Sequence, residues 1–363
     1  MKSFLSQGRT FRELERYLHN DQWMHLKGDL ATSLRLCRPI CFYLDAVDEF
    51  YEAAPQPWLS CQAGLFFAIM ELLRDERFGG RLHIFAALRD AVILRVVRSE
   101  HGLRHLHERY VRILEWDRKS IMLLLEQKIE NLDAQLKRSL NSKAPVERWL
   151  GRSVQRIPTR NRDEPITQYL LRHTRLLPRD IIIMGNILCT EMAREHWFPE
   201  MSSDADPIRD GVRAASINFG NELLSRCASY LMADMMPDDA IRDGYESVYL
   251  EKTAGLHNAV VKDLQRFLRS EAKFERVSAR KLGELSKKGA GYFGKEVDII
   301  QALWLNGLIG YLSSGEQKCS VFYSHRDAGD LQMPMHRQTY LFHSCLIDSV
   351  GIRAKGASTV QCP

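Results

Sequence analysis

The chain has 363 residues, of which 45% are hydrophobic and 27% charged, and its formal net charge is +5. These values are close to those of average soluble proteins, which excludes collagen-like and intrinsically disordered chains. At roughly 150 residues per domain, the length predicts two or three domains. The positive charge is concentrated in residues 137–175, which hold ten Lys or Arg and three acids, so any contact with a polyanion is expected there.

Membrane spans and metal or disulfide frameworks are not expected. The two long uncharged runs, residues 53–70 and 299–315, contain several polar residues, whereas a bilayer requires about 20 mostly apolar residues. The N-terminus has no apolar segment of signal-peptide length. The eight cysteines are scattered, without a Cys-x-x-Cys pair, unlike a disulfide framework or a zinc site. We therefore expect a reduced, cytoplasmic protein that makes no contact with membranes.

The first part of the chain predicts alternating helices and strands. Residues 1–40 have apolar side chains at helical spacing. Short apolar runs at residues 39–44, 81–88 and 110–114 are typical of buried strands, and residues 57–74 form a helical pattern between the first two. A strand, a helix and a second strand in this order predict a parallel unit with a right-handed crossover.

Beyond Trp116 the pattern is mainly helical. Residues 117–140 predict a helix, residues 142–163 a basic loop, and residues 166–194 further helix that Pro178 interrupts. An acidic linker at residues 201–207 precedes helices that extend to about residue 270.

The last segment predicts two helices and a hairpin. The helices cover residues 278–288 and 295–305, and the strands cover residues 308–312 and 320–323 with a tight turn between them. This order is a winged-helix pattern. The second helix would be the recognition helix, but Glu296 and Asp298 lie on it and would repel DNA. A packing module is therefore favoured over a DNA-binding one.

A group of acids follows the first strand. Asp45 comes directly after the apolar run, and Asp48 and Glu49 lie just beyond it. P-loop ATPases build Walker B in this way: the first carboxylate holds Mg²⁺, and the later acid polarises the attacking water. Ligands of open α/β sheets bind at the carboxyl ends of the strands, which is where these acids lie. The alternative is a buried strand that ends in a polar turn.

An arginine follows the next strand at the same edge of the expected sheet. Arg89 comes directly after residues 81–88, and its guanidinium is suited to a bidentate contact with a phosphate. The alternative is a structural salt bridge to one of the acids after the first strand.

Four short strings together resemble the STAND class of P-loop NTPases: LDAVDE at residues 44–49, LRD at 88–90, LEW at 114–116 and LPRD at 177–180. This class comprises signal-transduction ATPases allied to the AAA-type fold, including bacterial members implicated in phage defence. The resemblance spans about residues 35–345. It implies an α/β plus α fold with a partial parallel P-loop NTPase sheet, a helical lid and a C-terminal winged helix.

The resemblance also implies domain boundaries. Residues 1–116 would be the partial nucleotide-binding core, residues 117–200 the lid, residues 201–345 a helical linker with the winged helix, and residues 346–363 a tail.

By position, the resemblance implies roles for the residues at the strand ends. Asp45 would bind Mg²⁺, Asp48 or Glu49 would be the hydrolytic acid, and Arg89 would be sensor 1.

The lid would contribute Pro178 and Arg179, which would close on the nucleotide. The implied cofactors are ATP and Mg²⁺, and the implied function is that of an ATP-binding signalling switch.

The sequence departs from the class at the phosphate-binding loop. Residues 1–39 contain two glycines and no G-x-x-x-x-G-K-[ST] loop, without which little would hold the triphosphate. We expect an upstream segment or an N-terminal partner to supply this loop; the alternative is a degenerate member of the class. The segment GAGYFGKE at residues 289–296 resembles such a loop, but it follows a helix and carries Glu296 in place of Ser or Thr. We expect a turn between helices there.

Two readings come from other classes of protein. The runner-up is a winged-helix regulator that binds nucleic acid and uses its α/β half as a scaffold. A third is an interaction protein that binds no nucleotide. Ser216 has no Gly-x-Ser-x-Gly frame, so a hydrolase triad is not expected. The expected partners are the upstream partner and, in a homo-oligomer, further copies of this chain.

Overall fold

A computed structural model describes residues 21–45, 55–78, 80–88, 90–97, 104, 109–112, 114, 116–137, 142–157, 162–197, 206–235, 246–295, 297–313, 319–322, 332–353 and 360–361. The fold is mixed α/β, with many helices and three small sheets among these residues. The chain divides into two compact units, which are described separately. Unit 1 comprises Met1–Arg112 and Met232–Asn258, and unit 2 comprises Ile113–Leu231 and Ala259–Pro363.

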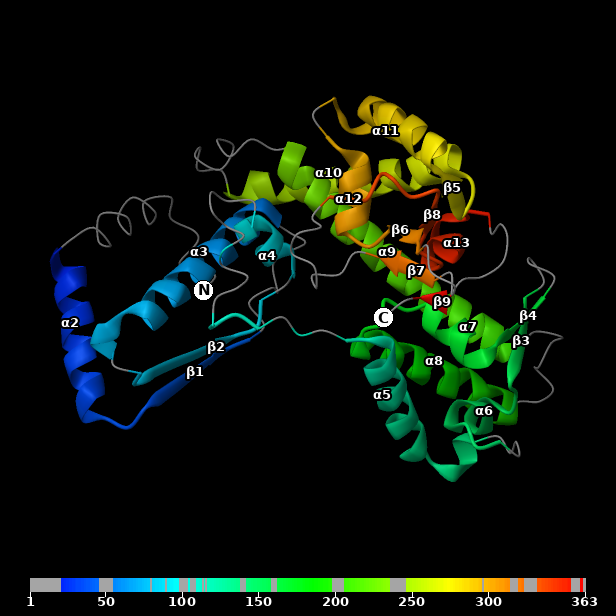
Figure 1. Ribbon diagram of the computed structural model, residues 1–363, viewed down its shortest axis with the longest axis horizontal. Coiled ribbons are helices and arrows are strands. Elements are labelled where there is room, and N and C mark those ends of the chain that lie inside the picture. The colour runs from blue at the N-terminus through cyan, green and yellow to red at the C-terminus, as the bar shows by residue number, and fades with distance from the viewer. Residues whose placement is uncertain are drawn as a thin grey trace. The chain divides into compact units, whose positions relative to one another are not determined.

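Unit 1 is built around a parallel strand–helix–strand motif (Figure 1). Strand β1 (Ile40–Leu44) and strand β2 (Leu82–Ala86) pair in parallel, in a register that places Ile40 opposite Leu82 and Leu44 opposite Ala86. Helix α3 (Pro55–Arg74) connects the two strands, as a parallel pair requires. The motif expected from the sequence is therefore present.

The third strand expected in unit 1 is not formed by the residues described there. Residues 109–110 form a turn, and residues 111, 112 and 114 have no regular secondary structure. Tyr110 and Val111 instead pack against a small cluster that includes Phe66, Met70 and Val96. The apolar run thus reflects side-chain packing against helices, which needs no backbone ladder.

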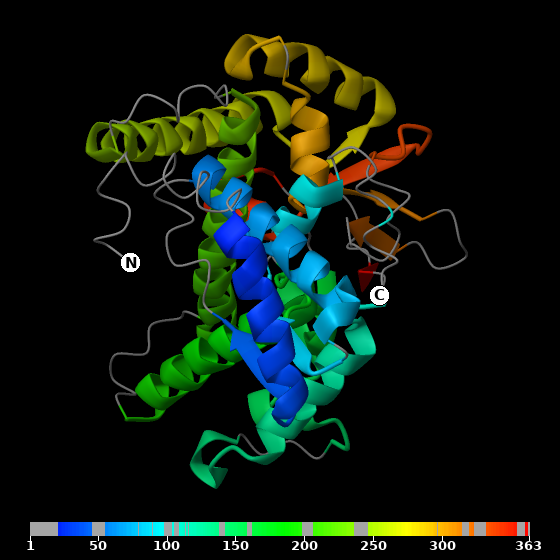
Figure 2. The ribbon, with the colours of Figure 1, turned by 90° about the vertical axis from the view of Figure 1, so that its left-hand side faces the viewer.

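Two further helices and a 3₁₀ turn also lie in unit 1: α2 (Asp21–Leu36), η1 (Glu76–Phe78) and α4 (Asp90–Val97). Figure 2 shows α2 (dark blue) and α3 (lighter blue), which meet where the side chains of Lys27 and Glu71 form an ion pair of 2.5 Å. Beneath α2, Ala31 and Leu34 pack with Phe78 and Leu82 in a small core.

Unit 2 begins with α5 (Arg118–Glu130), whose first turn is capped by the carboxylate of Asp117. The expectation of one helix over residues 117–140 is wrong beyond Glu130. Asn131 ends the helix, and a short 3₁₀ turn, η3 (Ala134–Leu136), follows it. Residues 138–141 lie outside the described residues.

The expectation of a basic loop over residues 142–163 is also wrong. This segment contains helix α6 (Pro145–Leu150) and most of an antiparallel hairpin of β3 (Val154–Ile157) and β4 (Arg162–Pro165). Pro145 occupies the first turn of α6, where a backbone N–H would have no intrahelical partner, so its absence in proline costs no hydrogen bond.

Three helices follow the hairpin: α7 (Ile166–Arg172), α8 (Pro178–Trp197) and α9 (Pro207–Met235). Pro178 does interrupt the helical pattern, because α8 begins there. These helices enclose a large hydrophobic core, which includes Trp149, Leu170 and Phe219. Its members extend from Ile121 on α5 to Cys345 near the end of the chain.

The C-terminal part of unit 2 combines helices with a five-stranded sheet. The helices are α10 (Glu246–Phe267), which belongs to unit 2 only from Ala259 on, α11 (Ala279–Phe293), α12 (Ile299–Leu305) and α13 (Cys345–Val350), and a π-helical turn η7 (Leu268–Ala272) follows α10. The strands are β5 (Arg276–Ser278), β6 (Ile309–Leu312), β7 (Cys319–Phe322), β8 (Thr339–Phe342) and β9 (Val360–Gln361), in the order β5-β8-β6-β7-β9. Two helices followed by a hairpin, as expected for residues 278–323, are present, with β8 lying between β5 and β6.

The glycine-rich segment that resembles a phosphate-binding loop is helical at its start. Gly289 and Gly291 lie within α11, so the turn expected there is shifted to Gly294, which ends the helix with a φ of +99°. A Cβ atom at Gly289 would meet Cγ2 of Ile299 at 2.3 Å. This glycine therefore serves the close packing of α11 on α12.

No described helix has the length and hydropathy needed to cross a lipid bilayer.

Candidate functional site

The end of β1 is the first candidate position. Asp45 directly follows this strand and is exposed. Because β1 and β2 are parallel, the ends of both strands lie at one edge of the pair, and the N–H of Ala87 still donates to the carbonyl of Leu44 across it (3.1 Å). A single carboxylate at such an edge can hold Mg²⁺ only together with waters and substrate phosphates.

The other residues expected at this edge cannot be placed. Asp48, Glu49 and Arg89 lie outside the described residues. Among those that are described, no group of three or more His, Cys, Asp or Glu side chains could hold a metal ion. Of the four residues expected at this edge, the structure therefore places only Asp45.

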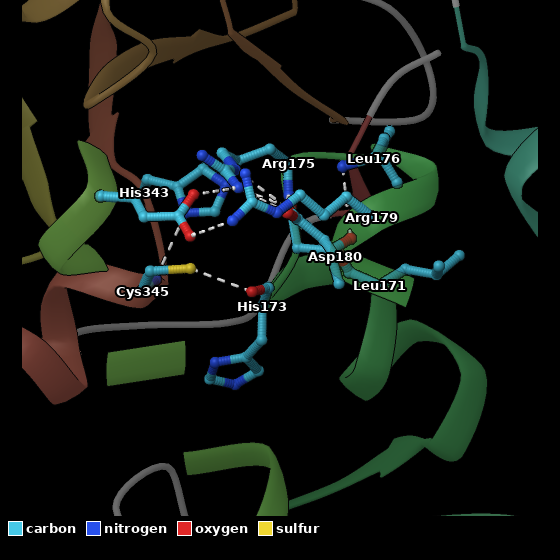
Figure 3. Close-up of polar contacts among 10 residues, drawn as sticks. Leu171, His173, Arg175, Leu176, Arg179, Asp180, His343 and Cys345 are labelled. Atoms are coloured by element: carbon cyan, nitrogen blue, oxygen red, sulfur yellow. Dashed lines mark hydrogen bonds and ion pairs between the residues drawn. The ribbon is translucent and has the colours of Figure 1, made fainter. Parts of the chain in front are cut away.

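The junction between α7 and α8, in unit 2, is the second candidate position (Figure 3). Pro178 begins α8, and Arg179 follows it with a side chain that is 71% exposed. The preceding turn is strained, because Leu176 has a φ of 56° although it carries a side chain. Such a conformation costs about 1–3 kcal/mol and persists only where neighbouring contacts hold it, often at functional sites.

Asp180 and Arg175 hold this turn together. Asp180 is fully buried and accepts from the backbone N–H of Arg175 (2.8 Å), from its Nε (2.9 Å) and from its Nη2 (2.5 Å). Burial alone would lower the pKa of Arg175, but the bonds and charges of Asp180 and Glu222 hold that pKa above its usual range. A bidentate pair of this kind fixes geometry as well as charge.

Glu222 on α9 connects two arginines of the junction. Its Oε2 lies 2.8 Å from Nη2 of Arg175, and its Oε1 lies 3.7 Å from Nη2 of Arg179. The first contact is largely buried on the arginine side, where only 14% of the side chain is exposed. The second is mostly in solvent. The side chain of Arg175 is thus fixed by its ion pairs, whereas the exposed ion pair with Glu222 holds Arg179 only weakly.

His343 and Cys345 connect the same turn to the strand and helix near the end of the chain (Figure 3). The N–H of Cys345 donates to Nδ1 of His343 (3.3 Å), so Nε2 carries the proton and donates to the carbonyl of Thr174 (3.2 Å). The thiol of Cys345 donates to the carbonyl of His173 (2.9 Å). Burial lowers the pKa of His343 to about 4, so the ring is neutral at pH 7.

A Ser, a His and an Asp also meet inside unit 2, at Ser216, where the sequence predicts no hydrolase triad. Nδ1 of His173 lies 2.9 Å from Oγ of Ser216 and 3.5 Å from Oδ2 of Asp348. A catalytic triad needs the serine and the acid on opposite nitrogens of the ring, whereas here both face Nδ1. All three side chains are also at least mostly buried. The arrangement is structural.

Three arginines of the basic segment pair with carboxylates. Arg148 pairs with Glu130 (2.6 Å), Arg152 with Asp206 (2.9 Å) and Arg156 with Asp163 (3.8 Å). The expected contact between residues 137–175 and a polyanion would have to displace these acids.

The expected recognition helix is not available for a nucleic-acid groove. In α12, every residue except Gln301 is buried, including Trp304. A helix that reads base edges must expose polar side chains along one face.

Comparison of the chain with models of protein families, with curated proteins and with solved structures found no match.

Two residues of the α7–α8 junction were not anticipated from the sequence. Glu222 lies on a long helix without a motif, and His343 is a single histidine after an apolar strand. The one available signal was Asp180, an acid in the first turn of a helix that begins with proline.

Proposed function

We propose that this chain is part of an ATP-binding signalling switch of the STAND type. The observation that carries the proposal is the position of Asp45, an exposed carboxylate directly after the first strand of a parallel strand–helix–strand motif. Such edges are where nucleotides and their Mg²⁺ bind in open α/β sheets. Asp45 would hold Mg²⁺ through water, with Asp48 or Glu49 as the hydrolytic acid and Arg89 as the residue that senses the terminal phosphate.

In this proposal, unit 2 supplies the lid and the winged helix. Arg179 is exposed in the first turn of α8, where an arginine can reach a phosphate, and Pro178 fixes the start of that helix. The winged helix would consist of α11, α12, β6 and β7, with β5 and β8 as additional strands of its sheet. Because α12 is buried, this module would act by packing rather than by binding DNA.

The proposal requires a phosphate-binding loop that residues 1–363 do not contain. We assign it to an upstream segment or to an N-terminal partner. The parallel pair β1 and β2 is compatible with such an addition, because β1 is exposed along most of its length and parallel sheets are normally covered on both faces.

The test is MgATP hydrolysis by the protein together with the segment or partner that carries the loop. Asp45→Ala should abolish turnover, because the metal would lose its protein ligand. Glu76→Ala is the matched control, since Glu76 is also an exposed acid of unit 1 but lies before β2. Unchanged turnover in Asp45→Ala would refute the assignment.

The runner-up function, duplex DNA binding, would give salt-dependent fluorescence anisotropy with this chain. The burial of α12 argues against it.

A further inference from the structure

Glu222 forms an ion pair with Arg179, and its two carboxylate oxygens face different arginines. Oε2 contacts Arg175, whose other partner, Asp180, is fully buried. Oε1 faces Arg179 at 3.7 Å. These two arginines and two acids together carry no net charge. The carboxylate of Asp180 balances one positive charge, and the carboxylate of Glu222 balances the other.

The two contacts of Glu222 differ in strength. The contact with Arg175 is short and, on the arginine side, shielded from water, whereas Arg179 is 71% exposed and its contact is longer than a hydrogen bond. An exposed pair of this kind is worth at most about 1 kcal/mol. Glu222 can therefore stay anchored to Arg175 while Arg179 leaves it.

The start of α8 adds a reason for Arg179 to exchange partners. The N-terminal turn of a helix carries a partial positive charge, which disfavours a cation there unless an anion is near. Glu222 now supplies that anion. A phosphate placed at Arg179 would supply it in turn, but the charge of Glu222 would repel the phosphate.

From this geometry we propose that Glu222 is an internal counter-anion that holds Arg179 and competes with a phosphate-bearing ligand for it. The inference rests on the proposed function for the role of Arg179 and adds the regulation of that site. Glu222 is a positioning residue: the ligand binds Arg179 only after the arginine leaves Oε1, and Glu222 remains on Arg175.

The first measurement uses this chain and inorganic pyrophosphate. Phenylglyoxal modifies accessible arginines, and mass mapping of peptides follows Arg179 separately. Pyrophosphate should protect Arg179, and in Glu222→Gln half-protection should need about three- to tenfold less pyrophosphate, since the competing charge is gone while size and hydrogen bonding remain. Glu191→Gln is the matched control, because Glu191 is 33% exposed and faces the exposed Arg194 at 3.8 Å on the same helix.

The second measurement uses MgATP and the protein with its phosphate-binding loop supplied. Glu222→Gln should lower the Kd by a similar factor, Arg179→Ala should raise it, and the double variant should match Arg179→Ala. A gain that persists without Arg179 would overturn the inference, as would equal protection by pyrophosphate in wild type and Glu222→Gln or no protection in either.

The two proposals fail in different ways. If MgATP does not bind but pyrophosphate protects Arg179 more strongly in Glu222→Gln, the proposed function fails and the role of Glu222 stands. If MgATP binds and Arg179→Ala has no effect on it, the role of Glu222 in nucleotide binding is refuted while the ATP site at Asp45 remains.

Discussion

The two units bury their apolar side chains to different degrees. Unit 2 has a large core, in which residues of helices α5 to α9 are buried together with Cys345 at the start of α13. The small clusters described in unit 1 contain three or four buried residues each, and Phe42, Tyr43 and Phe85 are 50%, 75% and 54% exposed. Tyr43 and Phe85 stack on each other at the surface, with ring centroids 5.1 Å apart. Local pairing of strands can therefore be specified without the burial that stabilises it.

The strongest way to test this difference is to break the buried ion pair of unit 2. Asp180→Ala should lower the free energy of unfolding by about 3–5 kcal/mol, because Arg175 loses its buried partner. Urea denaturation followed by tryptophan fluorescence measures the change. Asp163→Ala is the control, since its pair with Arg156 is exposed and should be worth less than about 1 kcal/mol. Equal losses in the two variants would contradict a special role for the buried pair.

Truncating one apolar side chain in each unit tests the comparison directly. Leu170 is 1% exposed, so Leu170→Ala should cost about 2–5 kcal/mol through lost contacts and a cavity. Tyr43→Ala should cost about 1 kcal/mol, because its side chain mainly loses the stacking on Phe85. Calorimetry of both variants against wild type gives the two values. A Tyr43→Ala loss as large as that of Leu170→Ala would show that the β1 face is buried in solution.

A further expected effect depends on pH and involves His343. Its pKa is about 4 in the folded protein and near 6.5 when unfolded. The unfolded state therefore binds a proton first as the pH falls, and stability should decrease between pH 6.5 and 4, by at most about 3 kcal/mol. Burial raises the pKa of Asp348, which acts in the opposite direction.

Comparison with His343→Gln isolates the histidine contribution from that of Asp348. The difference in urea midpoint between wild type and the variant should shrink as the pH falls from 7 to 4. A constant difference over this range would mean that His343 titrates normally in the folded protein.

Proline positions explain much of what the sequence did and did not predict about the fold. Pro178 was expected to interrupt a helix, and α8 starts there. Pro145 was taken as part of a loop, although it starts α6. Proline breaks a helix when it lies in the middle and favours a helix when it lies in the first turn. Only the neighbouring side chains decide which of the two effects a given proline has. Hairpin β3–β4 was missed because the sequence of β4, Arg-Asp-Glu-Pro, has no alternation of apolar residues.

Long-range contacts explain what was missed at the α7–α8 junction. The roles of Glu222 and His343 depend on Arg179 and Thr174, which lie on other segments of the chain. No local pattern encodes such a meeting. By contrast, the position of Asp45 at the end of β1 could be anticipated, because a strand and the residue that follows it are consecutive.

The core of unit 2 also has a consequence for the order of events during synthesis. Cys345 packs with residues of α5 to α9, and its thiol reaches the carbonyl of His173, 172 positions earlier. When only the first half of unit 2 has left the ribosome, the segment that contains Cys345 is not yet translated. The apolar faces of helices α5 to α9 that pack against this segment are then exposed to solvent. Nascent chains of this protein should need protection from aggregation until that last helix emerges.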